Sequence, residues 1–344
     1  MRDRWSMPLL VREARANLFS ARARGFPLVI LAVAVGALQV VVLATQERAL
    51  TEELTRLQQD GRNIVMITGS DRHTPARIDE SSCRALADDP AVVRAGGLGL
   101  PRLRDFVQLG SGITVVESSA GLFPELRAHD ALIGSALADV RGARLLEADD
   151  GTILDAVAGR AQPTGVDTDY AVVVPGSFVG SGASACVVVL DLFADASTTM
   201  PGLVSQVSST GGPIAATQAM SGGADPVRLH LAGIGRYLPA GWGLALALMA
   251  GVLTHVRAGE LAAYRFSGTS ARSLGILLSL EHLAVGGVLA AAGTAAALVG
   301  AQAFRDPAVP VISAVVSASV YVVAAHVLTV GVLRANPVDL AKDR

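Results

Sequence analysis

The sequence predicts an integral membrane protein with four transmembrane helices and a large mixed α/β domain between the first and second of them. Apolar residues make up 51% of the chain, and the mean hydropathy is +0.48. These residues are concentrated in four blocks, which is typical of membrane proteins. A long, mostly polar segment separates the first block from the other three. This 1+3 layout is the most informative feature of the chain.

The four blocks predict spans over residues 26–46, 236–256, 274–304 and 309–333. The first has no charged residue between Phe26 and Thr45. The uncharged run of the second reaches roughly 28 Å at about 1.5 Å per residue, enough for a hydrocarbon core. A cleaved signal peptide is the alternative for the first span. An uncleaved anchor is favoured because its apolar run exceeds the roughly 7–15 residues of a signal peptide.

Positive charge predicts the orientation of the spans. Arginine and lysine collect in residues 1–25, where we expect an amphipathic entry helix, in the 257–273 loop and in the 334–344 tail. Short loops rich in these residues stay cytoplasmic, so both termini and the loop are expected inside and residues 47–235 outside. The bias toward Arg, Ala and Gly is typical of a GC-rich bacterial genome. We therefore expect a multi-pass protein of the bacterial cell (inner) membrane.

Residues 47–235 alternate strand-like and helix-like segments. Runs rich in β-branched residues predict strands at 63–68, 113–117, 170–175 and 185–192. Helices are predicted at 78–86, 135–140 and 193–207. The segment is therefore interpreted as a mixed α/β domain.

No catalytic or metal-binding pattern is evident in this domain. His73 and His129 are isolated, and no Cys, His and carboxylate cluster has the spacing of metal ligands. The net charge of −2 and the lack of a basic stripe argue against a nucleic-acid partner. We therefore expect no catalytic residue, no bound metal and no cofactor on this chain.

The two cysteines, Cys83 and Cys186, both fall in the predicted outer domain. An oxidising compartment allows a disulfide between them, and a loop of this length makes the bond worth up to about 4–5 kcal/mol. Two separate buried thiols are the alternative, because cysteine is often buried.

A polar helix and a turn connect the second and third spans. Residues 257–266 carry Leu261 and Tyr264 on one face, Gly268 suits a helix end, and Thr269 or Ser270 can cap the next helix. The sequence therefore predicts a compact helix–turn–helix element in the cytoplasm that is suited to docking on a partner.

The order of residues in this element resembles that of permeases of the FtsX/MacB type, the mechanotransmission (type VII) class of ABC transporters. The resemblance rests on Arg257-x-x-Glu260, then Tyr264-Arg265-x-x-Gly268-x-Ser270, then Glu281. Residues 12–18, 63–67, 87–93 and 334–341 resemble the entry helix, outer-domain core and tail of such permeases. The similarity thus extends over the whole chain.

The resemblance implies a subunit that works as a dimer, with an identical or homologous second permease, on two copies of an ABC ATPase. ATP and Mg²⁺ would bind the ATPase, and an extracytoplasmic protein or lipopeptide would be the substrate. The only lysine, Lys342, lies too near the end for a Walker A motif, so this chain is not expected to hydrolyse ATP. The residues expected to couple to the ATPase are Arg257, Glu260, Tyr264, Arg265, Gly268, Ser270 and Arg272.

Glu281 is a further candidate, because a carboxylate near the membrane boundary is costly and usually paired or hydrated. Two alternatives to a transporter subunit stay open. One is a transmembrane signal transmitter that activates a cell-wall hydrolase without transport, and the other is a membrane-anchored binding protein with no ATPase.

Overall fold

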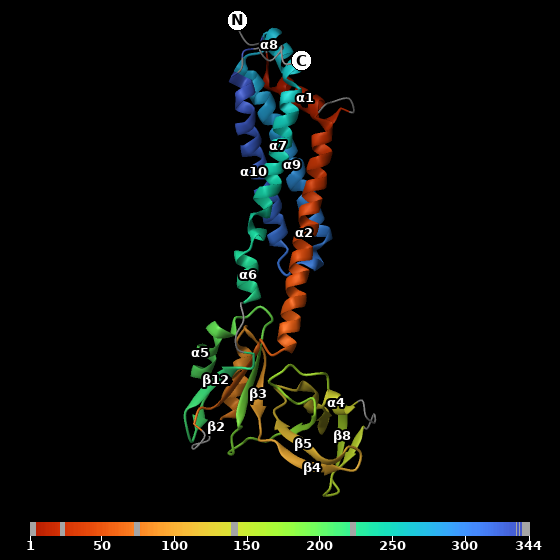
Figure 1. Cartoon of the computed structure of the whole chain (residues 1–344), viewed down its shortest axis with the longest axis vertical. Helices are drawn as coiled ribbons and strands as arrows, with labels where there is room; N and C mark the ends of the chain where they lie inside the picture. Colours follow the sequence, from red (N-terminus) through yellow and green to blue (C-terminus); the bar gives the residue numbers. More distant parts are fainter. Residues whose placement is uncertain are drawn as a thin grey trace. The chain divides into compact units, whose positions relative to one another are not determined.

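The computed structural model describes residues 5–20, 25–71, 76–138, 144–220, 225–334, 336 and 338. It divides into two compact units, a helical unit of residues 1–50 and 229–344 and a sheet unit of residues 51–228 (Figure 1). His73 and most of the 334–344 tail lie outside the described residues.

The helices that flank the sheet unit in the sequence are mostly long and apolar. Among the described residues, four helical segments are long and apolar enough to cross a membrane, at 26–59, 226–256, 271–299 and 308–334. One precedes the sheet strands in the chain and three follow them, which is compatible with a membrane protein. The helices are α1 (Met7–Phe19), α2 (Phe26–Gln59), α6 (Pro226–Ala232), α7 (Leu238–Val256), α8 (Ala258–Phe266), α9 (Ala271–Val299) and α10 (Ala308–Arg334), with short 3-10 turns at Ile234–Tyr237 and Ala301–Ala303.

Small residues let these helices approach closely. Helix α10 packs along both α7 and α9 (Figure 1). A Cβ atom on Gly36 of α2 would lie 2.7 Å from the carbonyl oxygen of Leu289, and one on Gly293 of α9 would lie 2.7 Å from Cβ of Ala314. Such contacts are typical of helix packing in membranes, where backbones meet across small residues.

The sheet unit contains a ten-stranded sheet in the order β12-β1-β10-β3-β5-β9-β6-β8-β7, with β4 paired to β5, and a separate β2–β11 pair. Most neighbours are antiparallel, while β5–β9 and β6–β8 are parallel. The strands are β1 (Ile64–Gly69), β2 (Arg77–Ile78), β3 (Val92–Leu98), β4 (Arg102–Phe106), β5 (Gly110–Ser118), β6 (Ala131–Ile133), β7 (Leu145–Glu147), β8 (Ile153–Ala158), β9 (Ala171–Pro175), β10 (Ala185–Leu190), β11 (Ser209–Thr210) and β12 (Ile214–Gln218).

Both faces of the central strands are buried. On β10, Val187 and Val189 pack with Ile64 on one face, while Val188 and Leu190 belong to a second core on the other. This explains why β10 is a continuous apolar run rather than an alternating one. The second core is covered by α3 (Glu80–Ala85) and α5 (Ala196–Gln206), and the short α4 (Ser135–Ala138) lies in the other half of the sheet unit (Figure 1).

The predicted strands appear as β1, β5, β9 and β10, so the mixed α/β architecture is confirmed. The helix predicted from Ile78 begins later, because Ile78 belongs to β2 and the carboxylate of Asp79 accepts hydrogen bonds from the first backbone N–H groups of α3. Asp195 caps α5 in the same way, which shortens the helix predicted from Phe193. Each acidic cap supplies the acceptor that a helix N-terminus needs.

A disulfide joins Cys83 of α3 to Cys186 of β10, with the two Cα atoms 5.8 Å apart. Of the two arrangements that the sequence allows, the structure has the bond and not two separate thiols. Both residues are fully buried in the second core. The bond therefore ties the helical cover of the sheet to its central strand.

Replacing Gly293 by valine should lower the free energy of unfolding by about 1–3 kcal/mol, because the new side chain would overpack the contact with α10. Gly287, also on α9, has no atom of a neighbouring helix within 4 Å of an added Cβ, so Gly287→Val makes the same change in helix propensity without the clash. Thermal unfolding of both variants in detergent measures the difference. Equal melting temperatures would contradict the close packing.

Reduction of the disulfide should lower the free energy of unfolding by up to about 4–5 kcal/mol, because the unfolded chain regains the freedom of a long loop. Denaturant unfolding with and without dithiothreitol measures this. The Cys83→Ala/Cys186→Ala variant should not respond to the reductant. A wild-type chain that is equally insensitive would show that the bond does not contribute.

Candidate functional site

Three of the residues singled out from the sequence shape the connections between α7, α8 and α9. Arg257 is both the C-cap of α7 and the N-cap of α8, so no loop separates the two helices. Gly268 follows α8 with a φ of +93°, a conformation that suits glycine. The hydroxyl of Ser270 then accepts a hydrogen bond from the backbone N–H of Ser273 and caps α9. The predicted helix–turn–helix element is thus present.

Arg257 and Glu281 form a buried ion pair at the base of this element. The Nη1 atom of Arg257 lies 2.8 Å from Oε2 of Glu281, and Nη2 lies 3.3 Å from Oε1. The residues are only 7% and 4% exposed. Two parallel bonds from a guanidinium to a carboxylate fix the orientation of both side chains as well as their distance. The pair therefore holds the α7–α8 junction against the middle of α9.

Helix α1 contributes a third side chain to the ion pair. The Nδ2 atom of Asn17 donates a hydrogen bond of 2.8 Å to Oε1 of Glu281. Asn17 lies beside Leu10, Ala14 and Leu18, the buried stripe of α1. Glu281 thus accepts hydrogen bonds from two segments that are far apart in the sequence, which offsets the cost of burying its charge.

A second contact fixes α1 to α8. The hydroxyl of Tyr264 donates a hydrogen bond of 2.6 Å to Oε1 of Glu13, and the rings of Trp5 and Tyr264 pack edge to face with centroids 5.9 Å apart. Leu10, Leu261 and neighbouring apolar residues of α9 and α10 complete this cluster. The N-terminal helix is therefore part of the same packed end of the helical unit as α8.

Electrostatics fix the protonation states of Arg257 and Tyr264. Burial disfavours the charge of Arg257, but the hydrogen bonds to Glu281 and Glu260 outweigh it and raise the pKa of the guanidinium. Burial, together with the hydrogen bond to Glu13, raises the pKa of Tyr264 to about 12. Arg257 is therefore a cation and Tyr264 a neutral donor at any physiological pH.

The remaining coupling candidates lie on or near the surface of the element. Gly268 and Arg272 are exposed and Arg265 is half-buried, while Phe266 between them is 62% exposed. Glu260 is half-buried and lies 3.3 Å from Nε of Arg257. The set proposed from the sequence therefore separates into two groups. Contacts within the element or to α1 and α9 are made by Arg257, Glu260, Tyr264 and Ser270. Its exposed tip is surrounded by Arg265, Gly268 and Arg272.

This separation changes the interpretation of Arg257. The sequence places it among residues that contact a partner, but its guanidinium is buried against Glu281 and is not presented on the surface. The expectation that Glu281 is paired holds. Sequence reasoning did not single out Glu13 and Asn17, although their i,i+4 spacing on an otherwise apolar stripe was a usable signal.

The side chains of this site are closely packed. A pocket of about 20 Å³ lies beside Arg257 and Glu281, enough for a single water molecule. Within the described ranges, no group of three or more His, Cys, Asp or Glu side chains could hold a metal ion. The side chains here fix helices to one another and leave no room for a substrate.

No protein-family model matches the chain, and no curated protein is significantly similar to it in sequence. The resemblance to FtsX/MacB-type permeases therefore stays a prediction, based on the residues named above.

Removing either partner of the ion pair should destabilise the helical unit by about 3–5 kcal/mol, because the other charge is left buried and unpaired. Arg257→Met and Glu281→Leu test this. The free energy of unfolding should fall less in the double variant than in either single variant, because no unpaired charge remains buried. Arg265→Met, a change of the same kind in the same element, is the control and should have little effect.

Unfolding of the four variants in detergent gives the coupling energy of the pair. Additive losses in the double variant would contradict the proposed interaction between the two charges.

Proposed function

We propose that this chain is the permease subunit of an ABC transporter complex in which a separate ATPase drives work outside the membrane, such as export or the extraction of a lipoprotein or peptide. The observation that carries the proposal is the buried Arg257–Glu281 pair with Asn17. It links α1, the α7–α8 junction and α9 into one body while the tip of the α8–α9 element stays exposed.

An element of this kind suits the transfer of force. A partner that pushes on the tip moves α8, and the bidentate pair and the contact between Tyr264 and Glu13 pass that displacement to α9 and α1. Rigid-body helix movement is a common form of conformational coupling. The exposed Phe266 beside Arg265 and Arg272 offers the apolar centre and charged rim of a small docking surface.

Two further features support the proposed orientation. Helix α1, helix α8 and Val332 near the end of α10 share one apolar cluster, so these three described segments lie at the same end of the helical unit. The disulfide of the sheet unit suits an oxidising compartment, as expected if residues 47–235 face outward. We accordingly place both termini in the cytoplasm of a bacterial cell.

By this proposal, the complex contains two ATPase copies, which hold ATP and Mg²⁺, and a second permease that is identical or homologous. The chain itself contributes no catalytic group. Its role is to convert movement at the cytoplasmic tip into movement of the helices that continue to the sheet domain.

Affinity purification of the tagged full-length chain from its native host in detergent, followed by an ATPase assay of the eluate, tests the proposal. We expect a co-purifying ABC ATPase that is reduced by about tenfold or more in Arg265→Glu/Arg272→Glu, because reversed interface charges repel the partner. Arg160→Glu, an exposed arginine of the sheet unit, is the matched control.

Absence of any ATPase from a folded wild-type preparation would overturn the proposal and favour an anchored binding protein. A cell-wall hydrolase in the eluate, with ATPase turnover that no candidate substrate stimulates, would favour the signal transmitter.

A further inference from the structure

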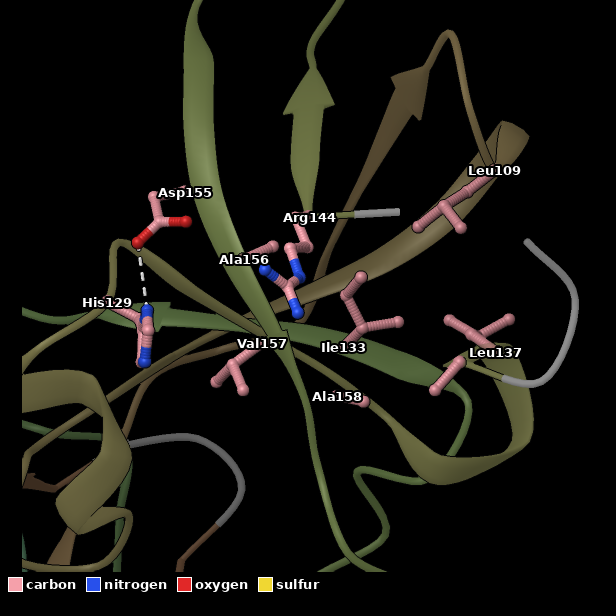
Figure 2. Close-up of a pocket in the computed structure, with 10 residues that line it drawn as sticks. Leu109, His129, Ile133, Leu137, Arg144, Asp155, Ala156, Val157 and Ala158 are labelled. Carbon is pink, nitrogen blue, oxygen red and sulfur yellow. Dashed lines mark hydrogen bonds and ion pairs between the residues drawn. The ribbon is translucent and has the colours of Figure 1, made fainter. Parts of the chain in front are cut away.

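A pocket in the sheet unit has the composition of a small-molecule site. It encloses about 470 Å³, which is within the usual range for ligand pockets. It lies where β8 passes the beginning of β7, since the backbone N–H of Ala156 is bonded to the carbonyl of Arg144, the residue just before β7 (Figure 2). The pocket lies entirely within one unit of the protein, so its shape is set by that unit.

One side of the pocket is apolar. Ile133 of β6, Leu137 of α4 and Leu109 of the β4–β5 turn line it, together with Val157 of β8 (Figure 2). Ile133 packs in a further buried cluster of the sheet unit with Phe106 and Leu146, so this wall is fixed by packing. A wall of this kind takes a hydrocarbon segment, and each methylene group that it covers adds to the affinity.

The other side of the pocket carries the polar residues His129, Arg144 and Asp155, and the carboxylate of Asp155 is already hydrogen-bonded. Nδ1 of His129 donates a hydrogen bond of 2.8 Å to Oδ2 of Asp155, which holds the imidazole at the edge of the pocket. Among the described residues, Arg144 has no ion pair. Figure 2 shows its guanidinium in the middle of the group, with His129 and Asp155 on one side and Ile133 and Leu137 on the other.

We propose that this pocket binds a small anionic amphiphile, an organic acid with a short hydrocarbon chain. The guanidinium of Arg144 takes the carboxylate in a forked pair of hydrogen bonds. The chain of the ligand lies along Leu137 and Ile133. The imidazole of His129, oriented by Asp155, closes the polar end. Such a site lies far in the sequence from the α8–α9 element and is independent of the proposed transport function.

Calorimetric titration of the full-length protein in lipid nanodiscs with sodium octanoate tests the inference, with empty nanodiscs as the background for partitioning. We expect saturable binding of one octanoate per chain. Affinity should rise about fourfold per methylene from butanoate to octanoate, as the apolar wall is filled. Octanol and octylamine, with the same chain but a neutral or cationic head, should bind at least about tenfold more weakly.

Arg144→Gln should weaken octanoate binding by about tenfold or more and leave octanol unaffected, because only the charged contact is lost. Arg144→Lys should restore part of the affinity, since it keeps the charge but not the fork. Arg102→Gln is the matched control, an exposed arginine on β4 that does not line the pocket. Unchanged thermal unfolding of each variant shows that the fold is intact.

Three results would overturn the inference: no saturable octanoate binding above the background, equal affinity for octylamine, or equal losses in Arg144→Gln and Arg102→Gln. Because no ATPase is present in this titration, its outcome and that of the affinity purification can be told apart.

Discussion

The helical unit depends on one electrostatic constraint, the burial of Glu281 in the middle of an apolar helix. A carboxylate in this environment is stable only when a cation and further donors meet it. Arg257 and Asn17 supply them from the α7–α8 junction and from α1. The position of α8 and the docking of the N-terminal helix both follow from that requirement. Leu261 and Leu10 pack in one buried apolar cluster next to these polar contacts.

The sheet unit is organised by a different constraint, because its central strands are buried on both faces. Helices α3 and α5 cover one face, and the disulfide fixes the first of them to β10. On the other face, Phe123 and Leu122 pack against residues from β1, β9 and β10 in a single cluster. That cluster lies beside a short part of the sheet, where the ladder between β3 and β5 has Leu98 opposite Ser118. Backbone hydrogen bonds from Gly99 to Glu117 and from Ser119 to Gly97 also join the two halves of the sheet.

Much of this architecture could be predicted from the sequence, and the exceptions have physical reasons. Long apolar helices and β-branched strands such as β10 can be recognised in the sequence, because an element that is buried on all sides needs a continuous apolar run. Strands β4 and β8 were missed because they are largely exposed and mix charged with apolar residues, as in the run from Arg102 to Phe106. The helix, the turn and the cap of the α8–α9 element could be predicted from the order of their residues. The division of these residues into a buried group and an exposed group could not, because it depends on Glu281 and Asn17.

The bond between Cys83 and Cys186 also makes a covalent ring of the chain between them, 103 residues apart in sequence. Strands β3 to β9, together with the pocket beside Arg144, all lie within this ring. A single proteolytic cut anywhere from Arg84 to Ala185 therefore opens the ring without releasing a fragment. A nicked chain would migrate as one species until it is reduced, and both pieces would stay attached to the helices on either side.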